Sequence, residues 1–249
     1  VIAVDRWLAG GSPYTPMQMQ PYELHTIALG LGYIYPPASL PLLIPLTWGD
    51  AGLLRAWAFG GGLAVGVVAA LMVRERGRRI ALLAFGVTML LPMDVGSGQA
   101  SAWVAAGIGL AYLYPRWGSV AAASAGSLKI YPMLAVRWWP ALLVPIGLGL
   151  ATIGLWPDWL TAWMNGRPGC PDWALPSLTC ATGATWPGYA LATVFLVGAW
   201  RAPRPIGFFL LTVAMILPAP DLFRGYLLVP YVGLLAVIGR VQRELGPSP

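Results

Sequence analysis

Lys129 lies at a break in an otherwise apolar stretch of the chain. It follows the small-residue segment 118–128 and precedes Tyr131 and Pro132. A helix that ends there would present the lysine ammonium at the outer mouth of a helix bundle. A compact cation at that height suits the phosphate of a lipid-linked substrate, so we interpret Lys129 as a donor-phosphate ligand and Tyr131 as a sugar or acceptor contact. The alternative is a lysine that only anchors a short helix at the membrane interface.

Two further turns combine a carboxylate with other polar groups. Asp94 lies in the Gly-rich segment 92–101, where Gln99 opens a helix whose N-terminal amides could hold an anion or sugar hydroxyls. Asp221 and Arg224 follow a Pro-Ala-Pro turn. We interpret Asp94 as a catalytic carboxylate, Gln99 and Asp221 as sugar or acceptor contacts, and Arg224 as a second phosphate ligand. The alternatives are a helix cap and turn around Asp94 and a local salt bridge between Asp221 and Arg224.

Several other chemistries are poorly supported by the residues present. The N-terminal segment carries Asp5, Glu23 and His25, the one histidine of the chain. One histidine and two cysteines give no basis for zinc catalysis or a histidine-dependent triad, and neither a phosphate loop nor a dinucleotide fingerprint occurs. We therefore expect no cofactor and no metal. An enzyme here should use carboxylate general-base chemistry, with Asp5 as the second candidate for the catalytic residue.

The composition indicates the environment in which these residues work. Of the 249 residues, 58% are hydrophobic and only 10% are charged, against about 25% charged in soluble domains. Such a chain needs several segments that face hydrocarbon. We then interpret the formal net charge of +6 as basic residues that keep short loops on the cytoplasmic side of a membrane. We therefore expect a bilayer and no nucleic acid as partner.

The hydropathy pattern predicts an all-α, polytopic bundle with about eight membrane segments in one transmembrane domain, 1–249. We expect an outer loop with an interfacial helix (35–46) in residues 1–49 and the motif-bearing helices in residues 50–156. A second outer loop is expected in residues 157–187, and the C-terminal helices in residues 188–249. The predicted segments are 51–73, 80–93, 99–114, 118–130, 132–139 with a turn, 140–156, 188–200, 205–219 and 225–239.

The basic residues predict the orientation of these segments, because short cytoplasmic loops retain Lys and Arg. The dense cluster at 74–79 is placed inside, which puts ten basic residues inside, at 74, 76, 78, 79, 116, 137, 201, 204, 240 and 243. This topology requires a break at 129–132, after which the chain returns to the inner side at Arg137. In the alternative, 118–137 is one Pro-kinked helix and all later loops change sides.

Two further features support this assignment of spans and sides. Cys170 and Cys180 lie in the loop 157–187, where an oxidising compartment would allow a disulfide; the alternative is two inert thiols. Tryptophans gather at the expected ends of the spans, as in an interfacial belt. They lie at 103, 117, 138, 139, 156, 186 and 200.

Several segments resemble, in order and spacing, the polyprenyl-phosphate-mannose-dependent mannosyltransferases of glycosyltransferase family 87. The resemblance rests on segments 10–14 (GGSPY), 35–37 (YPP) with 45–46, 98–99 (GQ), 125–132 (AGSLKIYP) and 137–139 (RWW), and it covers roughly residues 7–140. These enzymes have the GT-C architecture. Beyond residue 140 only the hydropathy profile is similar.

The resemblance implies inverting transfer of a sugar from a polyprenyl phosphate to an acceptor hydroxyl at the outer face. Lys129 falls on the family's lysine and Gln99 on its glutamine, whereas Ser101 replaces the usual asparagine. The family's first-loop aspartate lies farther upstream than Asp5, which is only eight residues before Pro13. The resemblance therefore implies a chain truncated at its N-terminus, with the family's base in a segment before Val1 and with Asp94 and Asp5 as the candidates inside the chain.

The leading hypothesis is thus a multi-pass enzyme of the cytoplasmic membrane with an outward-facing active site. It transfers a hexose, mannose in the family, from a lipid-linked donor to a lipid or glycan acceptor. A transporter or flippase with a site in its broken helices is the first alternative. A non-catalytic membrane subunit is the second.

Overall fold

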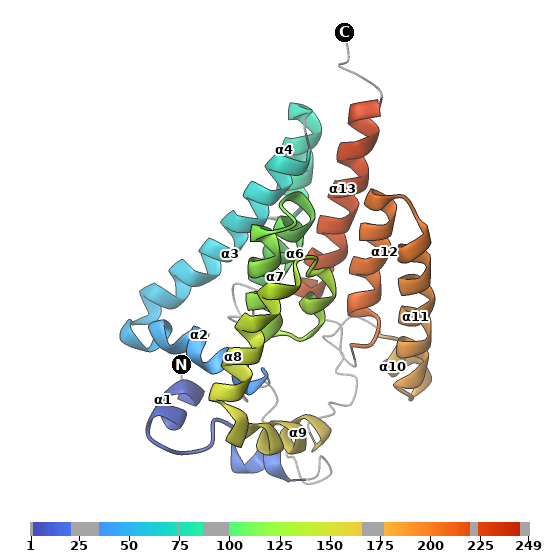
Figure 1. Ribbon diagram of the computed structural model, residues 1–249. Helices are drawn as coiled ribbons and strands as arrows, with labels where there is room; N and C mark the ends of the chain where they lie inside the picture. Colours follow the sequence, from blue (N-terminus) through green and yellow to red (C-terminus); the bar gives the residue numbers. More distant parts are fainter. Residues whose placement is uncertain are drawn as a thin grey trace.

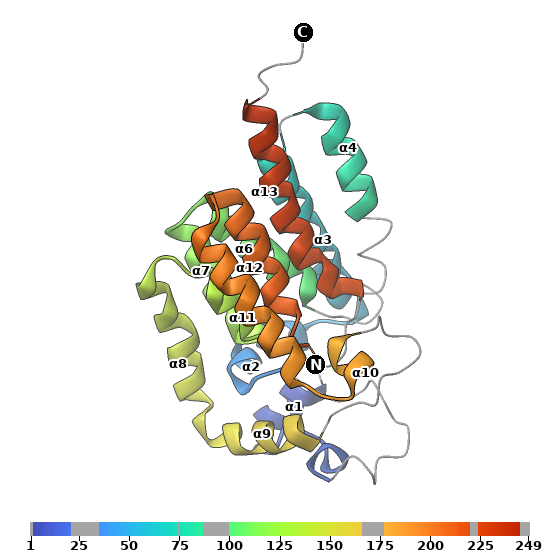
Figure 2. The same ribbon diagram turned by 90° about the vertical axis from the view of Figure 1, so that its right-hand side faces the viewer.

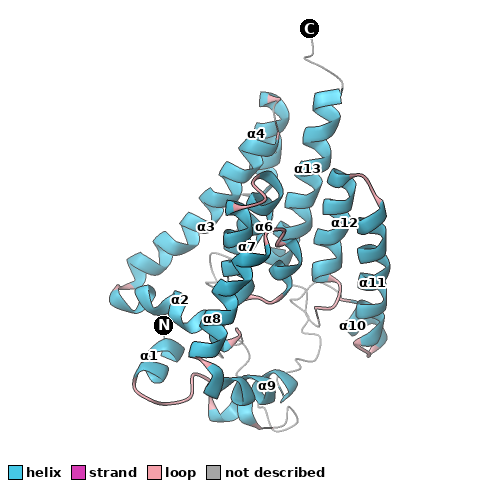
Figure 3. Cartoon of the chain, in the orientation of Figure 1, coloured by secondary structure: helices cyan, strands magenta, loops and turns pink. Residues whose placement is uncertain are grey.

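The computed structural model describes residues 2–20, 35–73, 75–86, 100–165, 177–219 and 224–244, and each regular element in these ranges is a helix (Figure 3). The predicted all-α class is confirmed for this part of the chain. The N-terminal and motif-bearing elements are α1 (Ile2–Leu8), η1 (Pro16–Met19), η3 (Pro37–Ser39), α2 (Leu40–Leu43), η4 (Ile44–Trp48), α3 (Ala51–Met72), α4 (Arg76–Phe85), α6 (Ser101–Leu113), α7 (Trp117–Leu128), η6 (Tyr131–Ala135), η7 (Trp139–Leu142) and α8 (Leu143–Ala151). The remaining elements are η8 (Ile153–Leu155), α9 (Trp156–Asn165), α10 (Leu178–Thr182), α11 (Trp186–Arg201), α12 (Arg204–Ile216), η9 (Arg224–Leu227) and α13 (Leu228–Glu244).

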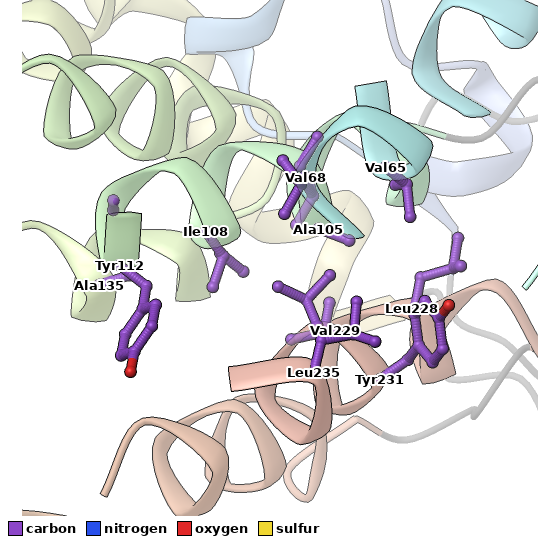
Figure 4. Close-up of a cluster of buried hydrophobic side chains, with 14 of the residues drawn as sticks. Val65, Val68, Ala105, Ile108, Tyr112, Ala135, Leu228, Val229, Tyr231 and Leu235 are labelled. Atoms are coloured by element: carbon purple, nitrogen blue, oxygen red, sulfur yellow. The ribbon is translucent and has the colours of Figure 1, made fainter. Parts of the chain in front are cut away.

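The core lies where α3, α6 and α13 meet, with α7 and α12 packed on their outer sides (Figures 1 and 4). Figure 4 shows Val68 of α3, Ile108 of α6 and Val229 of α13 directed toward one another. Ile108 and Val229 are fully buried. Because α6 consists of small and apolar residues on all sides, it can be covered by several neighbouring helices at once.

Glycines allow these helices to approach to backbone contact. A Cβ atom on Gly118 of α7 would overlap the carbonyl group of Leu110 in α6, and one on Gly107 would lie 2.9 Å from the Ala121 carbonyl oxygen. Gly239 of α13 faces the Met72 carbonyl at the end of α3 in the same way. Close contact through small residues is the packing that membrane helices favour.

The chain breaks after α7 and turns back along it. Lys129 is extended, with φ −144 and ψ 126, and Met133 of η6 then packs against Gly126. At the start of α7, Ser119 Oγ accepts hydrogen bonds from the backbone amides of Arg137 (2.9 Å) and Trp138 (3.1 Å). The predicted break at 129–132 is confirmed, and 118–137 is not one kinked helix.

The two ends of the bundle differ in charge. The end at the top of Figures 1 and 2, here called the basic end, holds the turns from α3 to α4, from α6 to α7 and from α11 to α12, together with the last turns of α13. It carries Arg76, Arg78, Arg79, Arg116, Arg137, Arg201, Arg204, Arg240 and Arg243. Arg74 lies outside the described residues. The opposite end holds Asp5, Asp50 and Asp158 together with Arg6, Arg55, Lys129 and Arg224, so most of the described basic residues gather at one end, as predicted.

Much of the outer surface between these ends is apolar. Phe59 and Leu63 of α3 are 70% and 71% exposed, and Val194 of α11 is 64% exposed. By length and composition, α3 is the one helix in the described ranges that could cross a membrane alone; residues 139–151 and 153–165 pass the same test only as a pair, which is either a broken span or a re-entrant loop. The helices α6 and α12 are apolar but shorter.

Tryptophans border this apolar surface at both ends. Trp117, Trp139 and Trp200 are 82%, 74% and 86% exposed at the basic end, and Trp48 and Trp186 are 78% and 70% exposed at the opposite end. This arrangement agrees with two interfacial belts.

Trp103 and Trp156 differ from the predicted interfacial tryptophans. The indole of Trp103 donates a 3.0 Å hydrogen bond to the Trp57 carbonyl inside the bundle. The indole of Trp156 donates to the Gly149 carbonyl.

Two predicted boundaries are wrong. The segment 140–156 is not one straight helix, because the chain bends by 68° at Thr152 between residues 139–151 and 153–165. The predicted loop 157–187 contains most of α9 and all of α10. Helix α9 packs against η1 of the N-terminal segment, where the Asn165 amide donates to the Met19 carbonyl at 3.1 Å.

Cys180 in α10 is disulfide-bonded. The other cysteine of the sequence, Cys170, lies outside the described residues. The predicted interfacial segment 35–46 is a run of short helical turns, η3, α2 and η4, and its Leu40 is fully buried.

Candidate functional site

Lys129 is enclosed at the end of the bundle opposite the basic end. Its side chain is only 9% exposed, and Nζ donates a 3.0 Å hydrogen bond to Oγ of the fully buried Ser101 at the start of α6. A lysine that only anchors a helix would extend its ammonium into water. Enclosing a cation is costly, which marks the position as a candidate site.

One tyrosine lies beside the ammonium, and a second tyrosine contacts the first. The Lys129 Nζ atom lies 3.9 Å from the ring centroid of Tyr226, a cation–π contact. The Tyr226 and Tyr131 rings are 6.5 Å apart and meet edge to face. We call Ser101, Lys129, Tyr131 and Tyr226 the Lys129 cluster; its members come from the start of α6, the end of α7, η6 and η9.

The N-terminal segment reaches this cluster through a chain of hydrogen bonds. The hydroxyl of Tyr14, a residue that is only 2% exposed, donates to the Tyr35 carbonyl at 3.1 Å. The Tyr35 hydroxyl accepts a 3.2 Å hydrogen bond from the backbone amide of Ala100. Ala100 directly precedes Ser101, so residues 14 and 35 support the turn that presents the Ser101 hydroxyl to Lys129.

The loop before Tyr14 is fixed from both sides. Ser12 Oγ donates a 2.9 Å hydrogen bond to the Asp158 carboxylate of α9, and Arg6 of α1 donates to the Pro13 carbonyl at 3.0 Å. Gly10 has φ +83, a conformation that glycine adopts without strain. The sequence segment 10–14 is therefore a rigid connection between α1, α9 and the cluster.

Two of the predicted site residues, Lys129 and Tyr131, come together here. Asp5 is exposed on α1, and in the described part of the chain no hydrogen bond or ion pair joins its carboxylate to the cluster. Arg224 is exposed at the start of η9, the short helix that also supplies Tyr226. Asp94, Gln99 and Asp221 lie outside the described residues.

Sequence reasoning missed Tyr226 and gave no contact role to Ser101 and Tyr35. Aromatic residues make up 12% of the chain, so one more tyrosine carries no signal by type. The one indication in the sequence was that Tyr226 lies two residues after Arg224, a predicted phosphate ligand. In the sequence Ser101 is marked only as a departure from the family's asparagine, yet its hydroxyl is the hydrogen-bond acceptor for Lys129.

The chemistry open to the cluster is anion binding next to aromatic surface. The Lys129 ammonium donates to the Ser101 hydroxyl and lies against the face of the Tyr226 ring, so it brings positive charge and aromatic surface together. Among the described residues, no group of three or more His, Cys, Asp or Glu could hold a metal ion. The absence of metal and cofactor remains a prediction.

Comparisons with models of protein families, with curated proteins and with solved structures found no match. The resemblance to glycosyltransferase family 87 therefore stays a prediction from the sequence segments alone.

Proposed function

We propose that the chain is a membrane glycosyltransferase that transfers a hexose from a polyprenyl-phosphate donor to a lipid or glycan acceptor. Mannose is the hexose that the resemblance implies. The observation that carries this proposal is the Lys129 cluster. It places a nearly enclosed cation and two tyrosines at one end of the bundle and joins them to sequence segments 10–14 and 35–37.

Membrane placement is supported by the exposed apolar side chains of α3, α8 and α11, by the tryptophans at both ends and by the segregated arginines. With the basic end in the cytoplasm, the Lys129 cluster faces the extracytoplasmic side of the plasma membrane. The bundle then has about eight membrane segments of GT-C type, several of them shorter than a full span.

The proposed reaction is one inverting displacement. The acceptor hydroxyl oxygen forms a bond to the anomeric carbon of the donor sugar as the bond between that carbon and the phosphate oxygen breaks. The polyprenyl phosphate leaves with the bonding electrons, and a carboxylate takes the acceptor proton, a role assigned to Asp94 with Asp5 as the second candidate. Lys129 stabilises the charge that develops on the leaving phosphate, where an enclosed cation acts most strongly.

Arg224 would hold the phosphate from the solvent side, since it is exposed on η9, two residues before Tyr226. Tyr131 offers an aromatic edge and a hydroxyl to the sugar. Gln99 and Asp221 complete the proposed sugar and acceptor contacts.

Competition binding tests whether the chain recognises a lipid phosphate. The purified chain in a phosphate-free maltoside detergent is given labelled polyprenyl-phosphate mannose, and unlabelled polyprenyl phosphate or the free polyprenol is added. If the chain makes a charge-assisted contact with the phosphate, polyprenyl phosphate should compete at a concentration at least about tenfold lower than free polyprenol. Equal competition by the two compounds would show that the lipid tail alone is bound and would contradict the proposal.

A further inference from the structure

A second cationic site lies at the basic end, on the other side of the bundle from the Lys129 cluster. It is an open pocket of about 480 Å³ between α11, α12 and the segment after η6. Its lining includes two arginines, Arg137 and Arg204, and the apolar side chains of Leu196, Trp200, Phe208 and Leu211. The pocket therefore combines paired positive charge with an apolar wall.

Arg204 is held in place by α6. Its guanidinium donates a 2.7 Å hydrogen bond to the Tyr112 carbonyl, where the last turn of α6 leaves carbonyl oxygens without helical partners. The guanidinium carbon also lies 5.0 Å from the Tyr112 ring centroid, and that ring stacks on Phe208 at 4.5 Å. These contacts fix the cation at the pocket wall.

Arg137 brings a second cation to the same pocket. Its backbone amide is fixed by Ser119 Oγ, while its guanidinium makes no hydrogen bond or ion pair with any residue that the structure describes. Burial, and next the positive charge of Arg204, lower the pKa of the Arg137 guanidinium from its ordinary value, a sign that the two cations act on one another. No described carboxylate neutralises either arginine. Two like charges held together in this way favour a bound anion.

The apolar part of the lining indicates which anion fits. Leu196 and Leu211 continue the pocket along α11 and α12, and the outer side of α11 exposes Val194 and Val197 at 64% and 41%. Trp200, 86% exposed at the pocket rim, is a residue type that prefers the level of lipid headgroups. A soluble anion would contact only the two arginines. An anionic phospholipid would contact the arginines with its phosphate and the apolar wall with its acyl chains.

We propose that the pocket formed by Arg137, Arg204 and Trp200 binds the phosphate of an anionic phospholipid from the leaflet at the basic end, with the acyl chains along α11 and α12. This proposal rests on the membrane placement in the proposed function but not on sugar transfer. The lipid would bridge α11 and α12 to the segment after η6, which folds back along α7.

Lipid titration of the whole chain in maltoside detergent tests the site, with phosphatidylglycerol as the probe and phosphatidylcholine as the zwitterionic reference. Binding is measured by native mass spectrometry. We expect Arg137→Gln to weaken phosphatidylglycerol binding about fivefold, and the double variant Arg137→Gln/Arg204→Gln about thirtyfold, since each arginine near a lipid phosphate contributes a similar increment. The single variant Arg137→Gln leaves the hydrogen bond from Arg204 to the Tyr112 carbonyl intact, so it tests the site even if the double variant folds poorly.

Arg201→Gln is the matched control, because it removes one exposed arginine from the same turn without touching the pocket. Its binding should equal that of the unchanged chain. Equal binding of both lipids, equal weakening by Arg201→Gln, or full competition by inorganic phosphate would overturn the proposal.

Lys129→Met should leave phosphatidylglycerol binding unchanged, so failure of the lipid site and failure of the proposed transferase are distinguishable. Loss of lipid binding in Lys129→Met would show that the lipid occupies the Lys129 cluster instead, and would also overturn the assignment.

Discussion

Replacing Lys129 with methionine is expected to lower the rate of sugar transfer by about 10²- to 10³-fold, the usual effect of removing one group that stabilises developing charge. Methionine is close to lysine in length and fills the space next to Tyr226, so packing should change little. The loss would then come from the ammonium that faces the leaving phosphate. The measurement is the initial rate of polyprenyl phosphate release from polyprenyl-phosphate mannose, in membranes that contain the natural acceptor lipids.

Two further variants separate charge from structure. Lys129→Arg keeps the positive charge in a different shape and should retain part of the rate. Ser124→Ala, on the partly exposed side of the same helix, should leave the rate unchanged. If Lys129→Met transfers sugar at the normal rate while folding normally, Lys129 does not bind the donor phosphate.

Replacing Gly118 with valine is expected to lower the free energy of unfolding by about 3 kcal/mol, because the new side chain would overlap backbone atoms. A Cβ atom at this position meets the carbonyl group of Leu110 and the amide of Ala111, and neither can move without shifting α6. Since α6 begins at Ser101, such a shift would also displace the hydrogen bond to Lys129. The measurement is unfolding in increasing sodium dodecyl sulfate, followed by circular dichroism.

Gly147→Val provides the control for intrinsic helix propensity. Gly147 lies inside α8 and is exposed, and a Cβ atom added there would meet no described atom within 4 Å beyond the backbone of its own helix. Valine there should change stability by less than about 1 kcal/mol. Equal destabilisation by the two substitutions would show that the contact between α6 and α7 does not depend on a glycine at position 118.

Local pattern predicted most of the helices but not all of their boundaries. The segments around 51–73, 99–114 and 205–219 coincide with α3, α6 and α12 to within a few residues, since a long apolar run in a helical protein has few other interpretations. The break at 129–132 was predictable because Pro132 cannot continue a helix and because the charge distribution required a return. The bend at Thr152 was not, since no charge lies near it and the nearest prolines, Pro145 and Pro157, are several residues away.

The site was less predictable than the fold for a physical reason. Lys129 could be recognised because an ionisable group in an apolar segment needs a local explanation. Tyr226 and Ser101 make their contacts across the bundle, from η9 and from the start of α6, and such contacts have no signature in sequence spacing. A tyrosine or serine in a membrane segment can also contact many kinds of partner. The residue type alone therefore did not indicate that Tyr226 and Ser101 contact Lys129.

The most direct test of the central claim uses the fact that Lys129 is the only lysine of the chain. In protein labelled with ¹⁵N-lysine, the side chain of Lys129 gives the one ¹⁵N amine signal, which is distinct from the signal of its backbone amide. Solid-state NMR can then measure the distance from Nζ to the ³¹P nucleus of bound polyprenyl-phosphate mannose in a phosphate-free glycolipid matrix. A direct contact predicts strong dephasing of the amine signal, with a nitrogen–phosphorus distance of about 4 Å. An amine signal that shows no dephasing when the donor is saturating would contradict phosphate binding by Lys129.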